Sequence, residues 1–425
     1  MPKPNMFKPK TVPHLTSKLK VAVIHEWLVT YAGSERVLAR MLKAVPQADV
    51  FTLVNFLEGD DLALVAGHNV THSFLQHLPG AQKNYRQYLP LMPLAIEQFD
   101  LSGYDLVISS NHAVAKGVLT GPDQLHVCMC YSPIRYAWDL QHQYLREADL
   151  ETGVKGAAAR ALLHYLRLWD SRTAPGVDLF ISISDFIARR VQKVYRRPSL
   201  VLYPPVDTSA FTPAEERGQT YMTASRMVPY KRIDLIVEAF SRMPDKRLIV
   251  IGDGPEMPKI RALAAPNVTI MGYQPFEVMR EEMRRTRAFI FAAEEDFGIA
   301  PIEAQACGTP VIAYGKGGAL ETIQDGISGL FFDEQTPRSL MDAVFRFEDQ
   351  PSTFAPEACR DNALRFGEAR FDQEFATALN AALLSWQAGR APEEIIAPLT
   401  RQFHHLSGQE SVEDLNARAL IGGKA

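Results

Sequence analysis

The chain has 425 residues, which is long enough for two domains, each with its own core. Hydrophobic residues make up 47%, charged residues 22%, and the formal net charge is -4, as in an ordinary folded protein. The near-neutral balance argues against a dedicated nucleic-acid binder, and no apolar run reaches the roughly 18 residues of a spanning helix. The basic, proline-rich N-terminus lacks an apolar h-region, so we expect no signal peptide and a cytoplasmic location.

Short apolar runs alternate with helical patterns along most of the chain, which predicts an α/β fold with parallel sheets. A helix should begin near Ser34, after the first strand, with Glu35 in its first turn, where negative charge suits the helix dipole. The strands predicted in the first half are 20–25, 49–54, 104–109, 126–131 and 178–183.

A second alternating series follows the segment YPPVDTSAFTP at 203–213, whose three prolines mark a linker. Its predicted strands are 220–225, 247–251, 267–271, 288–292, 310–314 and 329–332. We therefore predict two Rossmann-like domains facing each other across a cleft, at 1–202 and 214–370. A helix at 371–390 is expected to cross back to the first domain, and 391–425 is expected to be a polar, partly disordered tail.

The sequence EDFGIAPIE at 295–303 lies between a predicted strand and a predicted helix. Gly298 lets the backbone approach a ligand closely, and the amides from Gly298 to Ala300 would point out of the helix N-terminus, where a phosphate is favoured. Glu295 precedes the helix and Glu303 lies about one turn inside it, so the two carboxylates can reach different parts of one elongated ligand. The alternative is one helix-capping acid and one surface glutamate.

The sequence SRMVPYKR at 225–232 connects the first strand of the second domain to an amphipathic helix. Arg226 and Lys231 are two cations on what we expect to be an exposed loop, and they suit a diphosphate, since arginine binds bidentate and lysine is a compact charge. In isolation, a solvated basic pair explains them equally well.

Together with GTPVIAYGKGGALETI at 308–323, these motifs resemble the donor domain of family 4 retaining glycosyltransferases with the GT-B fold. The resemblance implies that Arg226 and Lys231 hold the diphosphate and stabilise the departing nucleotide. It also implies that Glu295 contacts the transferred sugar and that Glu303 holds the ribose hydroxyls. The remaining residues expected at the donor are Phe297, Gly298 and Ile299 in the same motif, and Gly272, Tyr273 and Gln274 beside the base.

The N-terminal half resembles bacterial transferases that add mannose from GDP-mannose during polysaccharide assembly. The resemblance rests on HEWLVTYAGSERVL, YDLVISSNHAVAKGV and CYSPIRYAWD. It places Gly33 near the diphosphate, although relatives usually show two glycines where this chain has Ala32-Gly33. It also places His112 beside the transferred sugar, where the alternative is an ordinary surface or capping histidine. Arg135 and Trp138 are expected to line the acceptor site or to be purely structural.

Metal ligation is not expected. Cys128 and Cys130 stand at period two in an apolar run, without a matching second pair, so they are predicted to be buried small hydrophobes. No D-x-D pair is present, and the acids at 294–296 match no complete ligand set. The sequence GDGPEM at 252–257 lacks the third glycine of a dinucleotide fingerprint and is predicted to be a tight turn.

The predicted activity is thus the metal-free transfer of mannose from GDP-mannose, without a cofactor, to a polyprenyl-diphosphate-linked saccharide. Three alternatives stay open: another nucleotide sugar, a GT-B epimerase, and a non-catalytic nucleotide-sugar-binding partner. Such an acceptor lies at a membrane, so the protein is expected to be peripheral at the inner face of the cytoplasmic membrane. Lys83 and Arg86 stand among aromatic and apolar residues in 83–99 and suit an anionic bilayer. In 155–172 the apolar residues are expected to pack into the core.

Overall fold

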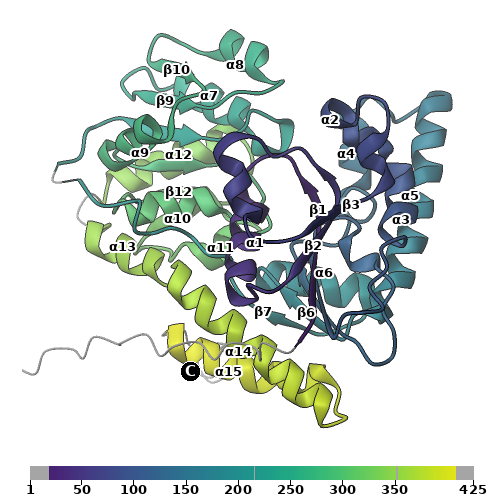
Figure 1. Ribbon diagram of the computed structural model, residues 1–425. Helices are drawn as coiled ribbons and strands as arrows, with labels where there is room; N and C mark the ends of the chain where they lie inside the picture. Colours follow the sequence, from purple (N-terminus) through teal and green to yellow (C-terminus); the bar gives the residue numbers. More distant parts are fainter. Residues whose placement is uncertain (1–18, 215, 351–352, 408–425) are drawn as a thin grey trace, which may run out of the picture. The chain divides into compact units, whose positions relative to one another are not determined.

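The computed structural model describes residues 19–214, 216–350 and 353–407, and the predictions for the N-terminus before residue 19 and the tail after residue 407 lie outside them (Figure 1). Two sheets form the framework, a seven-stranded sheet of order β3-β2-β1-β4-β5-β6-β7 and a six-stranded sheet of order β10-β9-β8-β11-β12-β13. In both, the strand order reverses next to the first strand, as in doubly wound Rossmann-like folds. The predicted α/β fold with two Rossmann-like domains is therefore confirmed.

The strands of the first sheet are β1 (Val21–Leu28), β2 (Asp49–Asn55), β3 (Val70–His72), β4 (Leu106–Asn111), β5 (Leu125–Cys130), β6 (Leu179–Ser182) and β7 (Ser199–Val201). The helices in the same stretch are α1 (Gly33–Ala44), α2 (Ala81–Asn84), α3 (Met92–Ile96), α4 (Gln141–Glu147), α5 (Gly153–Thr173) and α6 (Asp185–Tyr195).

The strands of the second sheet are β8 (Tyr221–Ala224), β9 (Leu248–Ile251), β10 (Val268–Gly272), β11 (Phe289–Phe291), β12 (Val311–Tyr314) and β13 (Gly329–Phe332). Its helices are α7 (Ile233–Ser241), α8 (Met257–Leu263), α9 (Phe276–Arg285), α10 (Ile299–Ala306), α11 (Ala319–Thr322), α12 (Pro337–Glu348) and α13 (Pro356–Leu364). The chain continues in α14 (Glu368–Gln387) and α15 (Ile396–Ser407).

The strands are apolar because a parallel sheet that is covered on both faces buries the side chains of both faces. In the first sheet, Val23 of β1 pairs in parallel with Val50 of β2 on one side and with Ile108 of β4 on the other. Each predicted strand overlaps an observed one. Two three-residue strands, β3 and β7, were not predicted.

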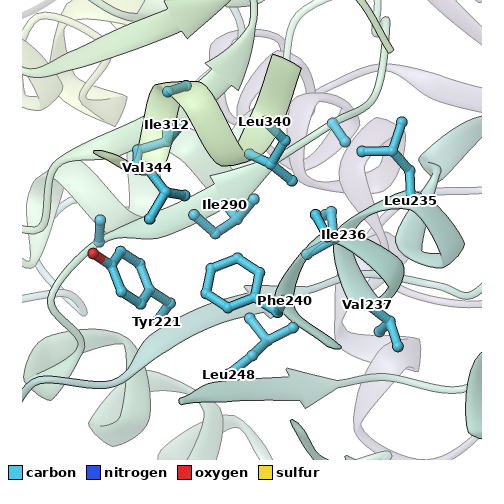
Figure 2. Packing of buried hydrophobic residues seen from close by; sticks show 14 of the residues in the cluster. Tyr221, Leu235, Ile236, Val237, Phe240, Leu248, Ile290, Ile312, Leu340 and Val344 are labelled. Atoms are coloured by element: carbon cyan, nitrogen blue, oxygen red, sulfur yellow. The ribbon is translucent and has the colours of Figure 1, made fainter. Parts of the chain in front are cut away.

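The core of the second sheet lies between its strands and the helices α7 and α12 (Figure 2). Phe240 of α7 is fully buried and lies beside Ile290 of β11 and Leu248 of β9. Leu340 and Val344, one turn apart on α12, are also fully buried in this cluster. This packing holds the strands, and therefore the loops that leave their carboxyl ends.

The chain forms two compact units, which are described one at a time below. The first comprises the described parts of Met1–Met129, Arg172–Ile181 and Phe371–Ala425, and the second comprises Cys130–Ser171 and Ser182–Arg370. The domain boundaries that the sequence predicts at 202 and 213 stay a prediction.

Helix α14 overlaps the predicted helix at 371–390, although it begins at Glu368 and ends at Gln387, and it belongs to the first unit from Phe371 on. There Asp372 accepts hydrogen bonds from Arg40 and Lys43 of α1, the latter at 3.3 Å. The segment expected to be a polar tail contains α15, so part of it is helical. Among the described residues, no helix has the length and apolar character needed to cross a membrane.

Candidate active site

The loops that carry the two predicted motifs leave neighbouring strands of the second sheet. Strands β8 and β11 pair with each other at the point where the strand order reverses. Ligands of doubly wound sheets bind beyond the carboxyl ends of strands at such a point. The loop 225–232 follows β8 and the loop 292–298 follows β11, so the fold brings both motifs to this edge.

Lys231 and Glu295 form an ion pair between these two loops. Lys231 ends a short 3-10 helix, Pro229–Lys231, and its Nζ donates to Oε1 of Glu295. Both side chains are only 18% exposed. Burial alone would lower the pKa of Lys231, but the carboxylate of Glu295 outweighs burial and raises it. The expectation that Lys231 lies on an exposed loop is therefore wrong, because its side chain turns inward to this partner.

Arg226 lies on the same loop, and its side chain is exposed. The backbone beneath it is fixed by the turn GDGPEM: the amide of Met227 donates to the carbonyl of Asp253 at 2.8 Å. A Cβ on Gly252 would stand 1.8 Å from the carbonyl oxygen of Ser225, and one on Gly254 would stand 2.4 Å from that of Met227. Both glycines also have φ above +130°. The predicted tight turn thus exists, and it supports the loop of Arg226.

The loop 293–298 is held by the packing of Phe297 and leads into the helix α10. The aromatic ring of Phe297 is buried and stacks on Tyr203, with centroids 5.7 Å apart. Gly298 caps α10 with φ 95°, a conformation that favours glycine. The first amides of α10, from Ile299 on, have no acceptor within the helix, so they can bind an anion. Glu303, on the second turn, is buried.

The residues predicted beside the base lie at the end of β10, the edge strand of the sheet. Gly272 has φ 73°, Tyr273 is 79% exposed, and the amide of Gln274 donates to the carbonyl of Met271 at 2.7 Å. Strand β9 separates β10 from β8. These residues therefore leave the sheet two strands away from the loop that carries Lys231.

In the first unit, a carboxylate holds His112. Glu26 is fully buried near the end of β1, and its Oε1 accepts hydrogen bonds from the four amides of 112–115 at 2.8–3.2 Å. Its Oε2 lies 2.8 Å from Nδ1 of His112. Burial would raise the pKa of Glu26, but His112 and these amides lower it to about 2. Glu26 therefore stays ionised and orients the imidazole.

Gly33 begins α1, directly after the loop that leaves β1. Glu35 accepts a hydrogen bond from the amide of Ala32 at 3.1 Å, and its other oxygen lies 3.3 Å from Nε2 of buried His25. The pKa of Glu35 is lowered, because these partners outweigh its burial. Strands β1 and β4 flank the order reversal of the first sheet, so Gly33 and His112 follow the two strands at which a ligand is expected.

The two residues predicted to line the acceptor site have different surroundings. Nη1 of Arg135 lies 3.1 Å from a carboxylate oxygen of Asp296, and its guanidinium lies 5.8 Å from the ring centre of Tyr230. Arg135 therefore borders the loops of both motifs. Trp138 donates its indole N–H to Asp170 at 2.7 Å, an interaction that fixes the fold of the second unit.

Three residues of these clusters were missed from the sequence: Glu26, Tyr230 and Asp296. Glu26 stands as a single carboxylate in the apolar strand VAVIHEWL, a signal that calls for a buried partner. Tyr230 and Asp296 adjoin motif residues, but only tertiary contacts reveal their partners. Among the described residues, no group of three or more His, Cys, Asp or Glu side chains is arranged to hold a metal ion.

Two comparisons with known proteins concern the sequence around the second sheet and the fold of the chain. Residues 208–366, which carry both motifs, match the family of glycosyl transferases group 1. The chain superimposes on the crystal structure of Anabaena Alr3699/HepE in complex with UDP with a TM-score of 0.63 at 15% identity, covering 85% of this chain and 100% of that chain. The fold is that of the GT-B glycosyltransferases, as the sequence predicts.

Two curated relatives are more similar in sequence to this chain than HepE is, over the parts that align. The chain is 30% identical over 159 residues to D-inositol 3-phosphate glycosyltransferase of Mycobacterium sp. (strain JLS), covering 31% of this chain and 35% of that protein. It is 30% identical over 206 residues to a GDP-mannose-dependent monoacylated alpha-(1-6)-phosphatidylinositol monomannoside mannosyltransferase of Corynebacterium glutamicum, covering 41% and 54%. The matches thus span about a third to about half of these relatives.

Proposed function

We propose that the protein is a retaining glycosyltransferase that moves mannose from GDP-mannose to a lipid-linked saccharide in polysaccharide biosynthesis. The observation that carries the proposal is the Lys231–Glu295 pair at the point where the strand order of the second sheet reverses. At this point a cation that suits the diphosphate lies next to a carboxylate that suits sugar hydroxyls. These are the two groups that a sugar–phosphate bond joins.

The proposed chemistry follows from where charge develops. As the bond between C1 of the sugar and the diphosphate breaks, negative charge grows on the departing nucleotide. Lys231, Arg226 and the N-terminus of α10 supply fixed positive charge for it, and such stabilisation is usually a large part of enzymatic rate enhancement. A new bond forms between C1 and an acceptor hydroxyl oxygen on the same face of the ring, and the proton of that hydroxyl passes to the departing diphosphate. His112, oriented by Glu26, is proposed to contact the transferred sugar.

Mannose and guanine are the finer part of the proposal. The named GDP-mannose dependence of the C. glutamicum relative supports them. HepE was crystallised with UDP, which supports a nucleotide-sugar donor in general. Gly272, Tyr273 and Gln274 are proposed to lie beside the base, and Glu303 beside the ribose.

We also propose that neither a metal ion nor a cofactor takes part. Arg226, Lys231 and the α10 amides offer the positive charge that a divalent cation supplies in other sugar-nucleotide enzymes. The lipid-linked acceptor places the working protein at the inner face of the cytoplasmic membrane. In support, Lys83 and Arg86 are exposed, and the nearby Leu94 is 50% exposed.

The experiment is a donor screen without acceptor. The protein is incubated with GDP-mannose, GDP-fucose, UDP-glucose, UDP-galactose and UDP-N-acetylglucosamine, each with and without excess EDTA, and products are separated by anion-exchange chromatography. We expect slow release of mannose and GDP that EDTA does not stop. Interconversion of sugars would identify an epimerase, and binding without turnover would identify a non-catalytic partner. Either result overturns the proposal. Activity that EDTA abolishes and magnesium restores would overturn the proposal that no metal takes part.

A further inference from the structure

A cavity of about 390 Å³ lies within the second unit, next to the candidate donor site. This volume falls within the roughly 300–1,000 Å³ of small-molecule sites. Its walls come from four places in the chain: the segment 135–147, the start of α7 with the residues before it, the loop 294–296, and single residues of other elements. The lining residues used below are Arg135, Tyr144, Glu147, Arg190, Tyr230, Arg232, Asp234, Lys259, Glu294 and Asp296.

The arginines on one wall are neutralised by carboxylates. Arg190 donates to Asp296 at 2.8 Å and lies 2.9 Å from Asp139. Arg135 lies 3.1 Å from the other oxygen of the same Asp296. Desolvation would lower the pKa of Arg135, but Asp296 and nearby groups raise it, so the guanidinium stays charged. These charges hold one another rather than face an anionic ligand.

The other two cations of the lining, Arg232 and Lys259, are also paired with a carboxylate. Asp234 lies 3.4 Å from Arg232 and 2.8 Å from Lys259. Two more carboxylates line the cavity, and both are exposed: Glu147, which accepts a hydrogen bond from the Gln143 amide, and Glu294. The four cations of the lining thus meet four carboxylates, two of which are not paired with any of them. Such a lining disfavours phosphate and favours hydrogen-bond donors without charge.

Two aromatic rings, of Tyr144 and Tyr230, complete the lining. Aromatic rings offer flat apolar faces, and tyrosine adds a hydroxyl at the edge. Carboxylates that accept hydrogen bonds, together with apolar ring faces, match the two kinds of surface of a sugar: its hydroxyls and its C–H faces. Tyr230 immediately precedes Lys231, and Glu294 and Asp296 flank Glu295, so the loops that carry the candidate donor residues also form part of the cavity wall.

We propose that this cavity binds the uncharged saccharide end of the acceptor. The inference rests on the proposed function, and it adds that the diphosphate and lipid of the acceptor stay outside the cavity. The ligand class is therefore a neutral glycoside that presents one hydroxyl toward the loops that carry Lys231 and Glu295. Anionic sugars are excluded by the carboxylates of Glu147 and Glu294.

The test measures binding directly, without donor, so its outcome does not depend on turnover in the donor screen. Methyl α-mannoside, methyl α-glucoside and a mannotriose are titrated against the full chain, with methyl glucuronide and mannose 6-phosphate as matched anionic probes. Saturation-transfer NMR detects the weak binding expected of a single sugar. We expect saturable binding of at least one neutral probe and at least about tenfold weaker binding of the anionic ones.

Three variants connect that binding to the cavity. Tyr144→Ala should weaken binding of the neutral probe by about tenfold. Tyr144→Phe should weaken this binding by no more than about threefold, because the ring remains. Glu147→Gln should narrow the difference between neutral and anionic probes by about fivefold, because one carboxylate is gone. Circular dichroism checks that each variant is folded. The absence of saturable neutral binding, stronger anionic binding, or binding that none of the three changes would overturn the proposal.

Discussion

Lys231 and Glu295 illustrate how single residues connect the two motifs. The sequence places each at the right end of a strand, yet only the fold shows that they form one pair. A partly buried ion pair adds little to stability, since desolvation offsets most of the attraction. In the proposed reaction its use is positional, because the pair would hold an ammonium and a carboxylate beside the sugar–phosphate bond.

The first prediction concerns Arg226 and Lys231, the two cations proposed to bind the diphosphate. Lys231→Ala and Arg226→Ala should each lower turnover at saturating donor by roughly 100-fold, equivalent to about 3 kcal/mol of transition-state stabilisation. Arg226→Ala should leave stability unchanged, because its side chain is exposed, whereas Lys231→Ala strands Glu295 and should cost about 1 kcal/mol. Arg261→Ala, an exposed cation on α8, is the control. Near-normal turnover of either variant would contradict the assignment.

The second prediction concerns Glu26 as a positioning residue. Glu26→Gln keeps the size of the side chain, but its amide nitrogen cannot accept from His112 or from the backbone amides that Glu26 now serves. We expect this change to lower kcat about tenfold with little effect on the donor KM. His112→Ala should lower kcat further. In the double variant, the Glu26 change should add almost nothing, because both act through one imidazole. Fully additive losses would show that Glu26 acts independently of His112.

At this scale, the sequence predicts residue types at strand ends better than it predicts their partners. Arg226, Lys231 and Glu295 follow strands, so their placement needs only the strand pattern. Glu26 depends on the backbone of 112–115, more than eighty residues away, which no local pattern reveals. Asp296 was read as one of several acidic neighbours, but it pairs with two arginines that come from other elements.

At the scale of elements, strand prediction succeeds where apolar runs reach four residues or more. Thus 329–332 coincides with β13, and 49–54 ends one residue before β2 does. Strands β3 and β7 have three residues each, too short to show periodicity. Their pairing is imposed by the neighbouring strands instead.

The loop of Glu295 depends on a second element, the glycine pair before α11. Gly318 donates its amide to the carbonyl of Glu295 at 2.8 Å, and Gly317 pairs with Glu295 as an isolated bridge. A Cβ on Gly318 would stand 2.4 Å from Cα of Phe297. The motif GKGGALE therefore supports the loop of EDFGIAPIE through backbone contacts.

The third prediction follows from that contact. Gly318→Ala should destabilise the second unit by about 2 kcal/mol and lower turnover, because the clash is with backbone that no side-chain rotation relieves. Gly103→Ala is the matched control, since nothing lies within 4 Å of its Cβ position, and its effect should stay within about 0.5 kcal/mol. Urea denaturation measures both. Equal stability of the two variants would contradict the role of the contact.

The fourth prediction concerns Glu321 of α11, which accepts hydrogen bonds from the first two amides of α6, at Asp185 and Phe186, at 2.7 and 2.8 Å. Burial raises its pKa from 4.5 to about 7, although these amides lower it. Between pH 4.5 and 7 the unfolded chain releases this proton and the folded protein keeps it. The stability that Glu321 contributes is therefore fully present below pH 4.5 and is lost as pH rises through 7.

The measurement compares wild type with Glu321→Gln from pH 5 to 8. The variant is expected to be less stable overall, since its amide group serves the two backbone donors less well. Its disadvantage should nevertheless shrink as pH rises: the difference in unfolding free energy, wild type minus variant, should fall by up to about 3 kcal/mol from pH 5 to pH 8. A difference that does not change with pH would show that Glu321 titrates normally.

For the whole molecule, the proposed association with a membrane requires an exposed surface that is basic and partly apolar. In 83–99 the structure buries Tyr85 and Met92 and exposes Lys83, Arg86 and Leu94, so a basic, partly apolar surface does form there. The guanidinium of Arg86 lies 5.2 Å from the ring centre of Tyr85. This segment consists of short helices, because Pro90 and Pro93 interrupt any longer one.

The second candidate segment differs from its prediction. On α5, Leu163, Leu166 and Trp169 are buried, as expected for a helix packed on a core. Tyr165 and Leu168, however, are 44% and 60% exposed. The expectation that all the apolar residues of 155–172 pack inward is therefore wrong, because one stripe of α5 faces away from the core.

The fifth prediction is salt-sensitive binding to anionic vesicles. Each basic residue near such a surface contributes on the order of 1 kcal/mol, so Lys83→Glu with Arg86→Glu should weaken binding by more than about 100-fold at low salt. Lys193→Glu with Arg261→Glu, two exposed cations elsewhere, is the control for net charge. Sedimentation with phosphatidylglycerol-containing and pure phosphatidylcholine vesicles measures binding, and Lys155→Glu tests α5 separately. Equal weakening by the control would reduce the effect to net charge, and no binding at low ionic strength would point to an acceptor that is not held in a membrane.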